Sequence, residues 1–328
     1  MHYKTTESLL AFIKKSPTAF QATAEMEKKF AENGYQLLSE QEYWKLQPGG
    51  KYIVTRNHSA LIAFSIPKKE CRKFHIIASH SDSPAFKIKE NPEMRVENAY
   101  TKLNVEGYGG MLMAPWFDRP LSVAGRVVVR RDGSLKEELV NIDRDLVMIP
   151  SLAIHMNRDV NKGVELNRQT DMLPLLGMGE DEDAFMQFLA KELGVDVKDI
   201  LDFELSTYVW EEPIMLGLQE EMISSPRIDN ISSCAAIVEA MCKNEAAKQL
   251  NIGICYDHEE IGSRTKQGAG SALLTDVIEK VYESMGLTVR TAKDAIYQGL
   301  MLSADVAHAL HPNHVEKADI TTQPVMGK

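Results

Sequence analysis

The stretch Asn251-Ile-Gly-Ile-Cys-Tyr-Asp-His-Glu-Glu-Ile-Gly262 decides how the rest of this sequence is interpreted. Its first part, up to Cys255, is a short apolar run that predicts a buried strand. The strand leads to the adjacent carboxylates of Glu259 and Glu260, which repel each other when ionised and therefore favour a nearby cation or proton. One glutamate could bind a metal while the other transfers protons. The alternative is a solvated acidic loop formed by Asp257, Glu259 and Glu260.

The composition is that of a globular protein that binds neither nucleic acid nor a membrane. The chain has 328 residues, 44% of them hydrophobic, which suits one large α/β domain or two ordinary ones. Its formal net charge of -10 argues against a nucleic-acid footprint. Residues 1–15 have apolar positions at helical spacing but no continuous apolar run of a signal peptide, so we expect a cytoplasmic protein.

The cysteines show no CxxC pairing, and each lies in or beside an apolar run. We therefore expect buried thiols in a reducing compartment at Cys71, Cys234, Cys242 and Cys255.

The pattern of predicted helices and strands changes twice along the chain. Residues 1–91 and 223–328 alternate helix-like and strand-like segments, which predicts one discontinuous α/β domain with a mixed sheet flanked by helices. Residues 92–222 carry many short strand-like segments and one helix-like piece near residues 182–193, which predicts an inserted β-rich domain.

Polar residues follow the predicted strands of the α/β part. His80 follows the strand at residues 73–79 with Asp82 two positions later, and Asp305 follows the strand at residues 298–303. Because ligands gather at the carboxyl edge of open α/β sheets, these residues and the Glu259-Glu260 pair predict a metal site. Asp229 opens a helix, where an aspartate is most commonly only an N-cap.

The residue types of this set suit a hard or borderline divalent ion. One histidine with several carboxylates and no cysteine fits zinc, manganese or cobalt, and a shared carboxylate would allow two ions. Asp82 is within reach to hold the His80 imidazole in one tautomer. His308, His311 and His314 are not assigned as ligands, because Pro312 interrupts a helical reading of their spacing.

The sequence resembles the M18 aspartyl aminopeptidase family. The resemblance rests on ordered motifs that span the chain: His80-Ser-Asp-Ser-Pro, Ser225-Pro-Arg-Ile-Asp-Asn, Asp257-His-Glu-Glu-Ile-Gly-Ser and Ser303-Ala-Asp-Val-Ala-His. Asn104-Val-Glu-Gly-Tyr-Gly-Gly and Pro150-Ser-Leu-Ala-Ile-His extend it into the insert. The resemblance implies a di-zinc exopeptidase that removes Asp, and also Glu, from peptide N-termini. It also implies a zinc-peptidase fold interrupted by a β-rich dimerisation domain, with dimers that assemble into a dodecamer.

The resemblance assigns roles to individual residues. His80, Asp229 and Asp305 would hold one metal, and Asp229 would bridge to a second ion that Glu260 also binds. Glu259 would be the general base that takes a proton from a metal-activated water, and Asp82 would orient His80. His155, which the local sequence alone indicates is structural, would reach from the insert into the active site of a neighbouring subunit.

The family continues beyond the point that matches Lys328, so we expect this chain to be cut short. The tail would carry the remaining histidine ligand of the second metal and the lysine that recognises the acidic side chain. Two alternatives therefore stay open: a catalytically silent subunit or fragment, and a related di-zinc aminopeptidase without acidic preference.

Overall fold

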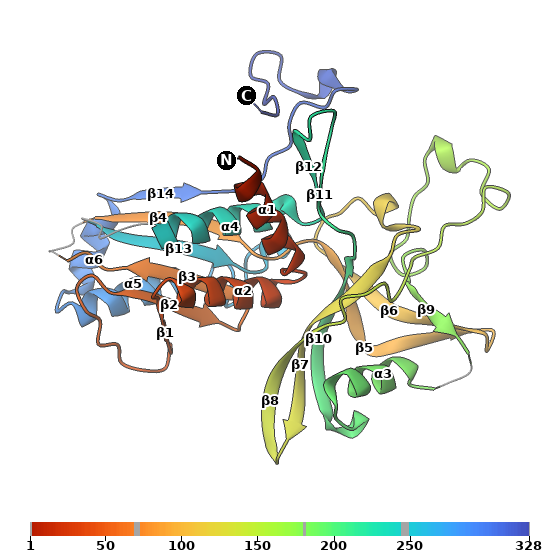
Figure 1. The fold of residues 1–328 in the computed structure, drawn as a ribbon, viewed down its shortest axis with the longest axis horizontal. Coiled ribbons are helices and arrows are strands. Elements are labelled where there is room, and N and C mark those ends of the chain that lie inside the picture. The colour runs from red at the N-terminus through yellow and green to blue at the C-terminus, as the bar shows by residue number, and fades with distance from the viewer. Residues whose placement is uncertain (1, 69–72, 180–181, 244–248, 328) are drawn as a thin grey trace.

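The computed structural model describes residues 2–68, 73–179, 182–243 and 249–327. Two sheets dominate it, one in each of two lobes that lie side by side in Figure 1. The first sheet has helices on both faces, and the second is antiparallel. The predicted α/β class with a mixed sheet flanked by helices is confirmed.

The first sheet brings the carboxyl ends of three strands to one edge. Its strand order is β1-β2-β3-β13-β4-β14, and β4, β13 and β14 are parallel to one another. In the register of this sheet, Tyr256 at the end of β13 pairs with His80 at the end of β4, and Ser303 pairs with Ala78. The strands are β1 (Gln36–Leu38), β2 (Lys51–Arg56), β3 (Ala60–Ser65), β4 (Phe74–His80), β13 (Leu250–Tyr256) and β14 (Leu300–Ser303).

Helices cover both faces of this sheet and close a core on each. Helices α1 (His2–Lys14), α2 (Ala19–Glu32) and α4 (Ile228–Lys243) pack on one face, and α5 (Leu273–Ser284) and α6 (Val289–Ile296) on the other. Every residue of β13 is buried, which explains its unbroken apolar sequence. Gly253 lets α4 approach β13, because a Cβ there would lie 2.6 Å from the Ile237 side chain.

The segment between β4 and α4 forms the second sheet, in the order β8-β7-β10-β5-β6-β9. Helix α3 (Ala184–Leu193) packs into the core of this sheet through Phe185 and Leu189. The strands are β5 (Ala85–Val96), β6 (Tyr100–Tyr108), β7 (Leu121–Arg131), β8 (Ser134–Asn141), β9 (Leu175–Met178) and β10 (Ile200–Val209). A hairpin of β11 (Ile214–Leu216) and β12 (Met222–Ser224) then leads to α4. Strand β5 crosses the predicted boundary at residues 91 and 92, and the division into domains stays a prediction.

Short 3-10 helices connect several of these elements. They are η1 (Ala114–Trp116), η2 (Val160–Lys162), η3 (Val197–Asp199), η4 (Glu259–Ile261) and η5 (Val315–Lys317). Of these, η4 follows β13 directly and carries the glutamate pair.

The cysteine prediction needs one correction. Cys234 and Cys255 are buried and free, as expected, but Cys242 is only partly buried because it lies near the end of α4, beside an open groove against α1 and α2. Cys71 lies outside the described residues. Within the described part of the chain, no helix combines the length and the apolar character that crossing a bilayer requires.

Candidate metal centre

His80 ends β4 and is buried, at 4% exposure. Its Nε2 atom faces the carboxylates: it lies 3.3 Å from Asp229 Oδ1, 3.6 Å from Asp305 Oδ1 and 3.9 Å from Glu259 Oε2. Its Nδ1 atom faces Asp82, 3.1 Å from the carbonyl oxygen and 3.3 Å from Oδ1. Because both of these oxygens only accept hydrogen bonds, Nδ1 carries the proton and Nε2 is left for a ligand.

Asp229 and Asp305 come from opposite ends of the last third of the chain and meet above His80. Asp229 lies in the first turn of α4, where its φ and ψ are not helical and its bond to Asn230 is cis. The Asn230 side chain donates to the carbonyl of Ala304, 2.9 Å away, which ties this turn to the chain after β14. Burial and the nearby Asp305 raise the pKa of Asp229. Asp229 therefore does more than cap a helix.

Glu259 and Glu260 lie on η4, one turn beyond the buried end of β13. Their backbone N–H groups both donate to Asp82, to Oδ1 and Oδ2 respectively, at 3.2 Å. The side chain of Glu259 is about half exposed (47%). Burial, followed by the charges of Asp82, Asp229 and Glu259, raises the pKa of Glu260 to about 7, although His80 lowers it. The backbone of the pair is therefore held by the buried Asp82, which a freely solvated loop would not show.

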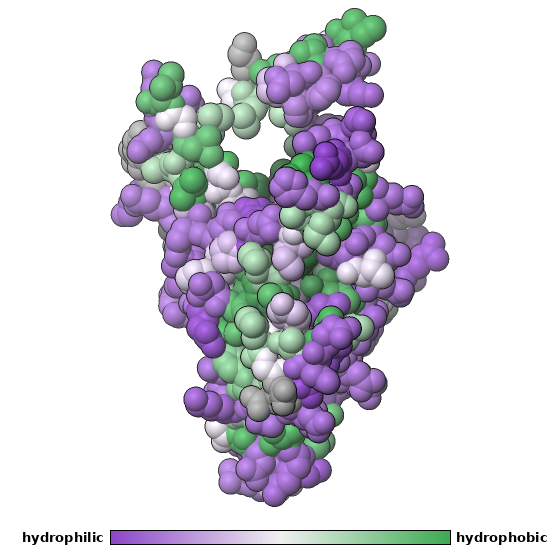
Figure 2. All heavy atoms as spheres, turned by 90° about the vertical axis from the view of Figure 1, so that its right-hand side faces the viewer, coloured by the Kyte–Doolittle hydropathy of each residue, from purple (hydrophilic) through white to green (hydrophobic). Residues whose placement is uncertain are grey.

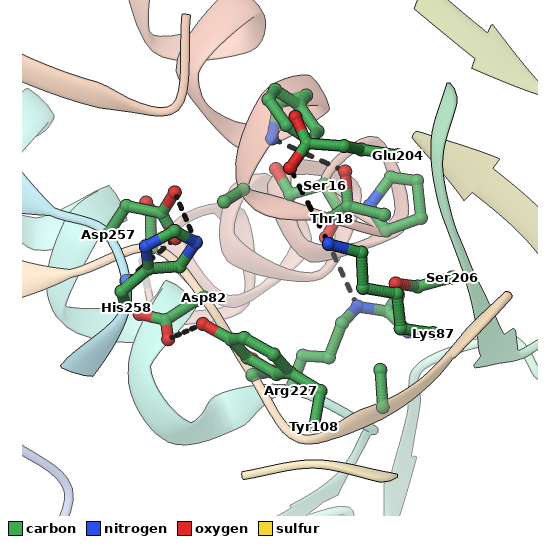
Figure 3. Close-up of a pocket in the computed structure, with 16 residues that line it drawn as sticks. Ser16, Thr18, Asp82, Lys87, Tyr108, Glu204, Ser206, Arg227, Asp257 and His258 are labelled. Carbon is green, nitrogen blue, oxygen red and sulfur yellow. Dashed lines mark hydrogen bonds and ion pairs between the residues drawn. The ribbon is translucent and has the colours of Figure 1, made fainter. Parts of the chain in front are cut away.

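Asp82 is 4% exposed and connects these groups. Besides His80 and the two backbone N–H groups, it accepts a hydrogen bond from the Tyr108 hydroxyl, 2.6 Å from Oδ2. Figure 3 shows this contact at the wall of a cavity of about 80 Å³, which Asp257 and His258 also line. Although burial raises the pKa of Asp82, the hydrogen bonds from His80 and Tyr108 lower it overall.

The sequence placed Tyr108 in the motif Asn104-Val-Glu-Gly-Tyr-Gly-Gly of the insert but gave it no role at the site. In the structure Tyr108 ends β6 of the second sheet and reaches the site from there. Nothing local in the sequence could have paired it with Asp82.

The candidate ligands form two overlapping groups with donor atoms within 4.8 Å of one another. One contains His80, Asp229 and Asp305, and the other contains His80, Glu259 and Glu260. Burial lowers the pKa of His80, but Asp82, Glu259 and Asp305 raise it to about 9, so this cluster favours a positive charge. An imidazole nitrogen among carboxylate oxygens is also a donor set that zinc accepts. The residues present therefore fit a divalent cation.

Other candidates lie away from these groups. His155 is exposed in the loop between β8 and β9, and His308, His311 and His314 are exposed near the end of the described chain. Arg227 donates to the backbone carbonyls of Ser16 and Ile13 and stacks on Tyr208, which gives it a structural role.

An imidazole and carboxylates at the carboxyl edge of parallel strands are typical of metal-dependent hydrolases. Residues 12–328 match the family model described as aminopeptidase I zinc metalloprotease (M18). A probable M18 family aminopeptidase 2 of Clostridium novyi (strain NT) is 43% identical over 99% of this chain and 77% of its own length. The protein of the same description from Clostridium acetobutylicum is 44% identical over 97% of this chain and 75% of its own length.

Solved structures agree with these relatives. The cryo-EM structure of the Ape4 and Nbr1 complex contains a chain that is 34% identical, with a TM-score of 0.94 over 99% of this chain and 67% of that one. The structure of Chaetomium thermophilum mApe1 is 29% identical, with a TM-score of 0.89 over 97% of this chain and 78% of that one. The chain belongs to the M18 family of zinc metallopeptidases, and its relatives identify it as a metallo-aminopeptidase.

Proposed function

We propose that this chain removes N-terminal Asp, and also Glu, from peptides, with two zinc ions at the cluster around His80. The observation that carries the proposal is the placement of His80 Nε2, which faces Asp229, Asp305 and Glu259 at 3.3 to 3.9 Å while Asp82 holds the opposite ring nitrogen. The resemblance to aspartyl aminopeptidases supports the acidic preference. Manganese or cobalt would fit the same oxygen and nitrogen donors.

In this proposal His80, Asp229 and Asp305 hold the first ion, and Asp229 and Glu260 hold the second. The ions, when bound, polarise the scissile carbonyl and activate a water molecule. Asp229 would suit a bridging role, because it faces His80, because burial and Asp305 raise its pKa, and because its charge adds to the effect of burial in raising the pKa of Glu260. Within the described residues, neither donor group offers the second ion a histidine of its own. We therefore expect the second ion to bind more weakly than the first.

Glu259 acts as the general base. Its carboxylate is half exposed and lies 3.9 Å from His80 Nε2, and among the described residues no hydrogen bond occupies it. It can therefore take a proton from the attacking water and deliver it to the leaving amine, whereas Asp82 is fixed by its four donors. Glu260 is more enclosed than Glu259, so its carboxylate is less suited to exchange protons with water.

The insert supplies the contacts between subunits in this proposal. We assign residues 92–222 to dimerisation, with His155 reaching the active site of a neighbouring subunit, and we expect a homo-oligomer that builds to a dodecamer. Exposed apolar side chains on projecting segments support this: Leu152, Ile154 and Met156 lie in the loop before β9, and Leu218 lies at the tip of the β11–β12 hairpin. Figure 2 shows such hydrophobic residues on segments that project from the body of the molecule. We place the protein in the cytoplasm.

The test measures metal content and hydrolysis on the same preparation. Zinc per chain is determined, and cleavage rates are compared for matched peptides that begin with Asp, Glu, Leu or Ala, before and after chelation. Zinc-dependent cleavage that is fastest for Asp supports the proposal. Faster cleavage of Leu or Ala peptides would replace it with a non-acidic aminopeptidase, and loaded zinc without turnover would identify a silent subunit.

A further inference from the structure

Tyr108 connects the second sheet to the candidate metal centre. It is the last residue of β6, and its hydroxyl donates to Asp82 Oδ2 at 2.6 Å. Figure 3 shows the Tyr108 hydroxyl directed at the carboxylate of Asp82, which lies in the loop between β4 and β5. The centroid of the Tyr108 ring lies 6.0 Å from that of the His258 ring, and the two rings are tilted relative to each other. The length of this hydrogen bond is that of a charge-assisted bond from a hydroxyl to a carboxylate, and the bond is partly buried.

Asp82 links Tyr108 to Glu259, Glu260 and His80. Its Oδ2 accepts from Tyr108 and from the backbone N–H of Glu260, and its Oδ1 accepts from the N–H of Glu259 and faces His80 Nδ1. A buried carboxylate with this many donors has little freedom to rotate. The orientation of the Asp82 side chain therefore determines where the η4 turn and the His80 ring lie relative to each other.

Gly109 adds a second contact at the same place. Its φ of +76° is in the left-handed region, and a Cβ on it would lie 3.0 Å from the Glu260 Cβ. Arg168 donates to the carbonyl oxygen of Gly109 at 3.3 Å and holds this turn from the solvent side. Only glycine combines that backbone conformation with so close an approach. The end of β6 thus touches Glu260 through its backbone and Asp82 through its hydroxyl.

We propose that Tyr108 is a positioning residue, which together with Gly109 fixes Asp82 and, through it, the Glu259–Glu260 turn and the His80 imidazole. The second sheet then contributes to the chemistry of the first, beyond any contact between subunits. The part of this inference that concerns turnover rests on the proposed function. The part that concerns the order of the turn does not.

The first test needs no turnover. Hydrogen exchange of the amides of residues 257–262 is measured on chelator-treated Tyr108→Phe and compared with the unchanged chain. We expect the Glu259 and Glu260 amides to exchange about tenfold faster, because their acceptor loses its fixed orientation. The control is Tyr208→Phe, which removes a hydroxyl of the same sheet that donates to Asn141 at 2.7 Å. It should leave the exchange of residues 257–262 unchanged.

The second test separates positioning from general stability. We expect Tyr108→Phe to lower kcat by about 10- to 100-fold with little change in KM, and to weaken zinc binding in a chelator competition. Tyr208→Phe should change neither quantity, even where it lowers Tm to a similar degree. Gly109→Ala should reproduce the faster exchange if it folds, because it moves the same turn through Glu260. Unchanged exchange and unchanged zinc affinity in a folded Tyr108→Phe protein would overturn the proposal, and so would equal effects of the two tyrosine variants.

Discussion

Glu259→Gln isolates proton transfer from every other feature of the site. The substitution keeps the shape of the side chain and leaves the backbone N–H that donates to Asp82 at 3.2 Å. It removes only a negative charge and its ability to accept a proton. We expect the variant to retain its fold and its zinc while losing turnover.

The structure sets the expected size of the change in Tm and of the loss in kcat. The Glu259 carboxylate lies 3.9 Å from His80 Nε2, and the Glu259 side chain is 47% exposed. At that distance in a water-like environment the attraction is about 1 kcal/mol, and relief of repulsion from Glu260 and Asp229 offsets it. Tm should therefore move by no more than about 4 °C. Loss of a general base lowers kcat by about 10²- to 10⁴-fold, which corresponds to about 3 to 5 kcal/mol of activation free energy.

The assay follows the release of Asp from an N-terminal Asp peptide at several substrate concentrations, with zinc content measured on the same sample. Glu283→Gln is the matched control, because Glu283 is an exposed glutamate on α5, on a helix that packs far from the carboxyl edge of β4. It should behave like the unchanged chain. A Glu259→Gln protein with full zinc and a kcat within about threefold of the unchanged value would refute the assignment of Glu259 as the base.

The other predictions concern ligand roles and pH. His80→Asn should weaken binding of the first zinc ion by more than about 100-fold, because it removes the imidazole ligand proposed for that ion; an unchanged affinity for the tighter ion in equilibrium dialysis would contradict this. Glu260→Ala should lose the weaker ion and keep the tighter one, so complete loss of zinc would show that its ion is not the under-ligated one. Burial raises the pKa of Glu204, but its hydrogen bond from Arg126 lowers that pKa overall. The stability that Glu204 contributes is therefore present above the ordinary glutamate pKa and is lost below it. Urea unfolding should show Glu204→Gln destabilised at pH 7, with the difference shrinking below about pH 4.

The sequence predicted the layers of the first sheet well because its signals are local. The apolar run at Leu250–Tyr256 is buried along its whole length, as a strand covered by helices on both faces must be. Helix α4 buries Ile231, Cys234, Ile237, Val238 and Met241, which recur at the three- and four-residue spacing of one helix face. The boundary between the two sheets was harder to place, since β5 already begins at Ala85 and pairs with β6 on both sides of residues 91 and 92.

The sequence by itself determined which residue types gather at the carboxyl edge: one histidine and several carboxylates, each just after a strand or at the start of a helix. These positions follow from short-range pattern and from the rule that parallel strands end together. The pairing of Asp82 with His80 could also be predicted locally, since the two residues are two positions apart.

Only the tertiary structure decided how these residues are held. The pairing of Tyr256 with His80 sets the glutamate pair beside the imidazole. That register joins β4 and β13, two strands that are far apart in the sequence. The hydrogen bond from Tyr108 to Asp82 and the contact of Gly109 with Glu260 join the two sheets. Such contacts depend on the relative placement of whole layers, which burial of their separate cores fixes and which no stretch of sequence encodes alone.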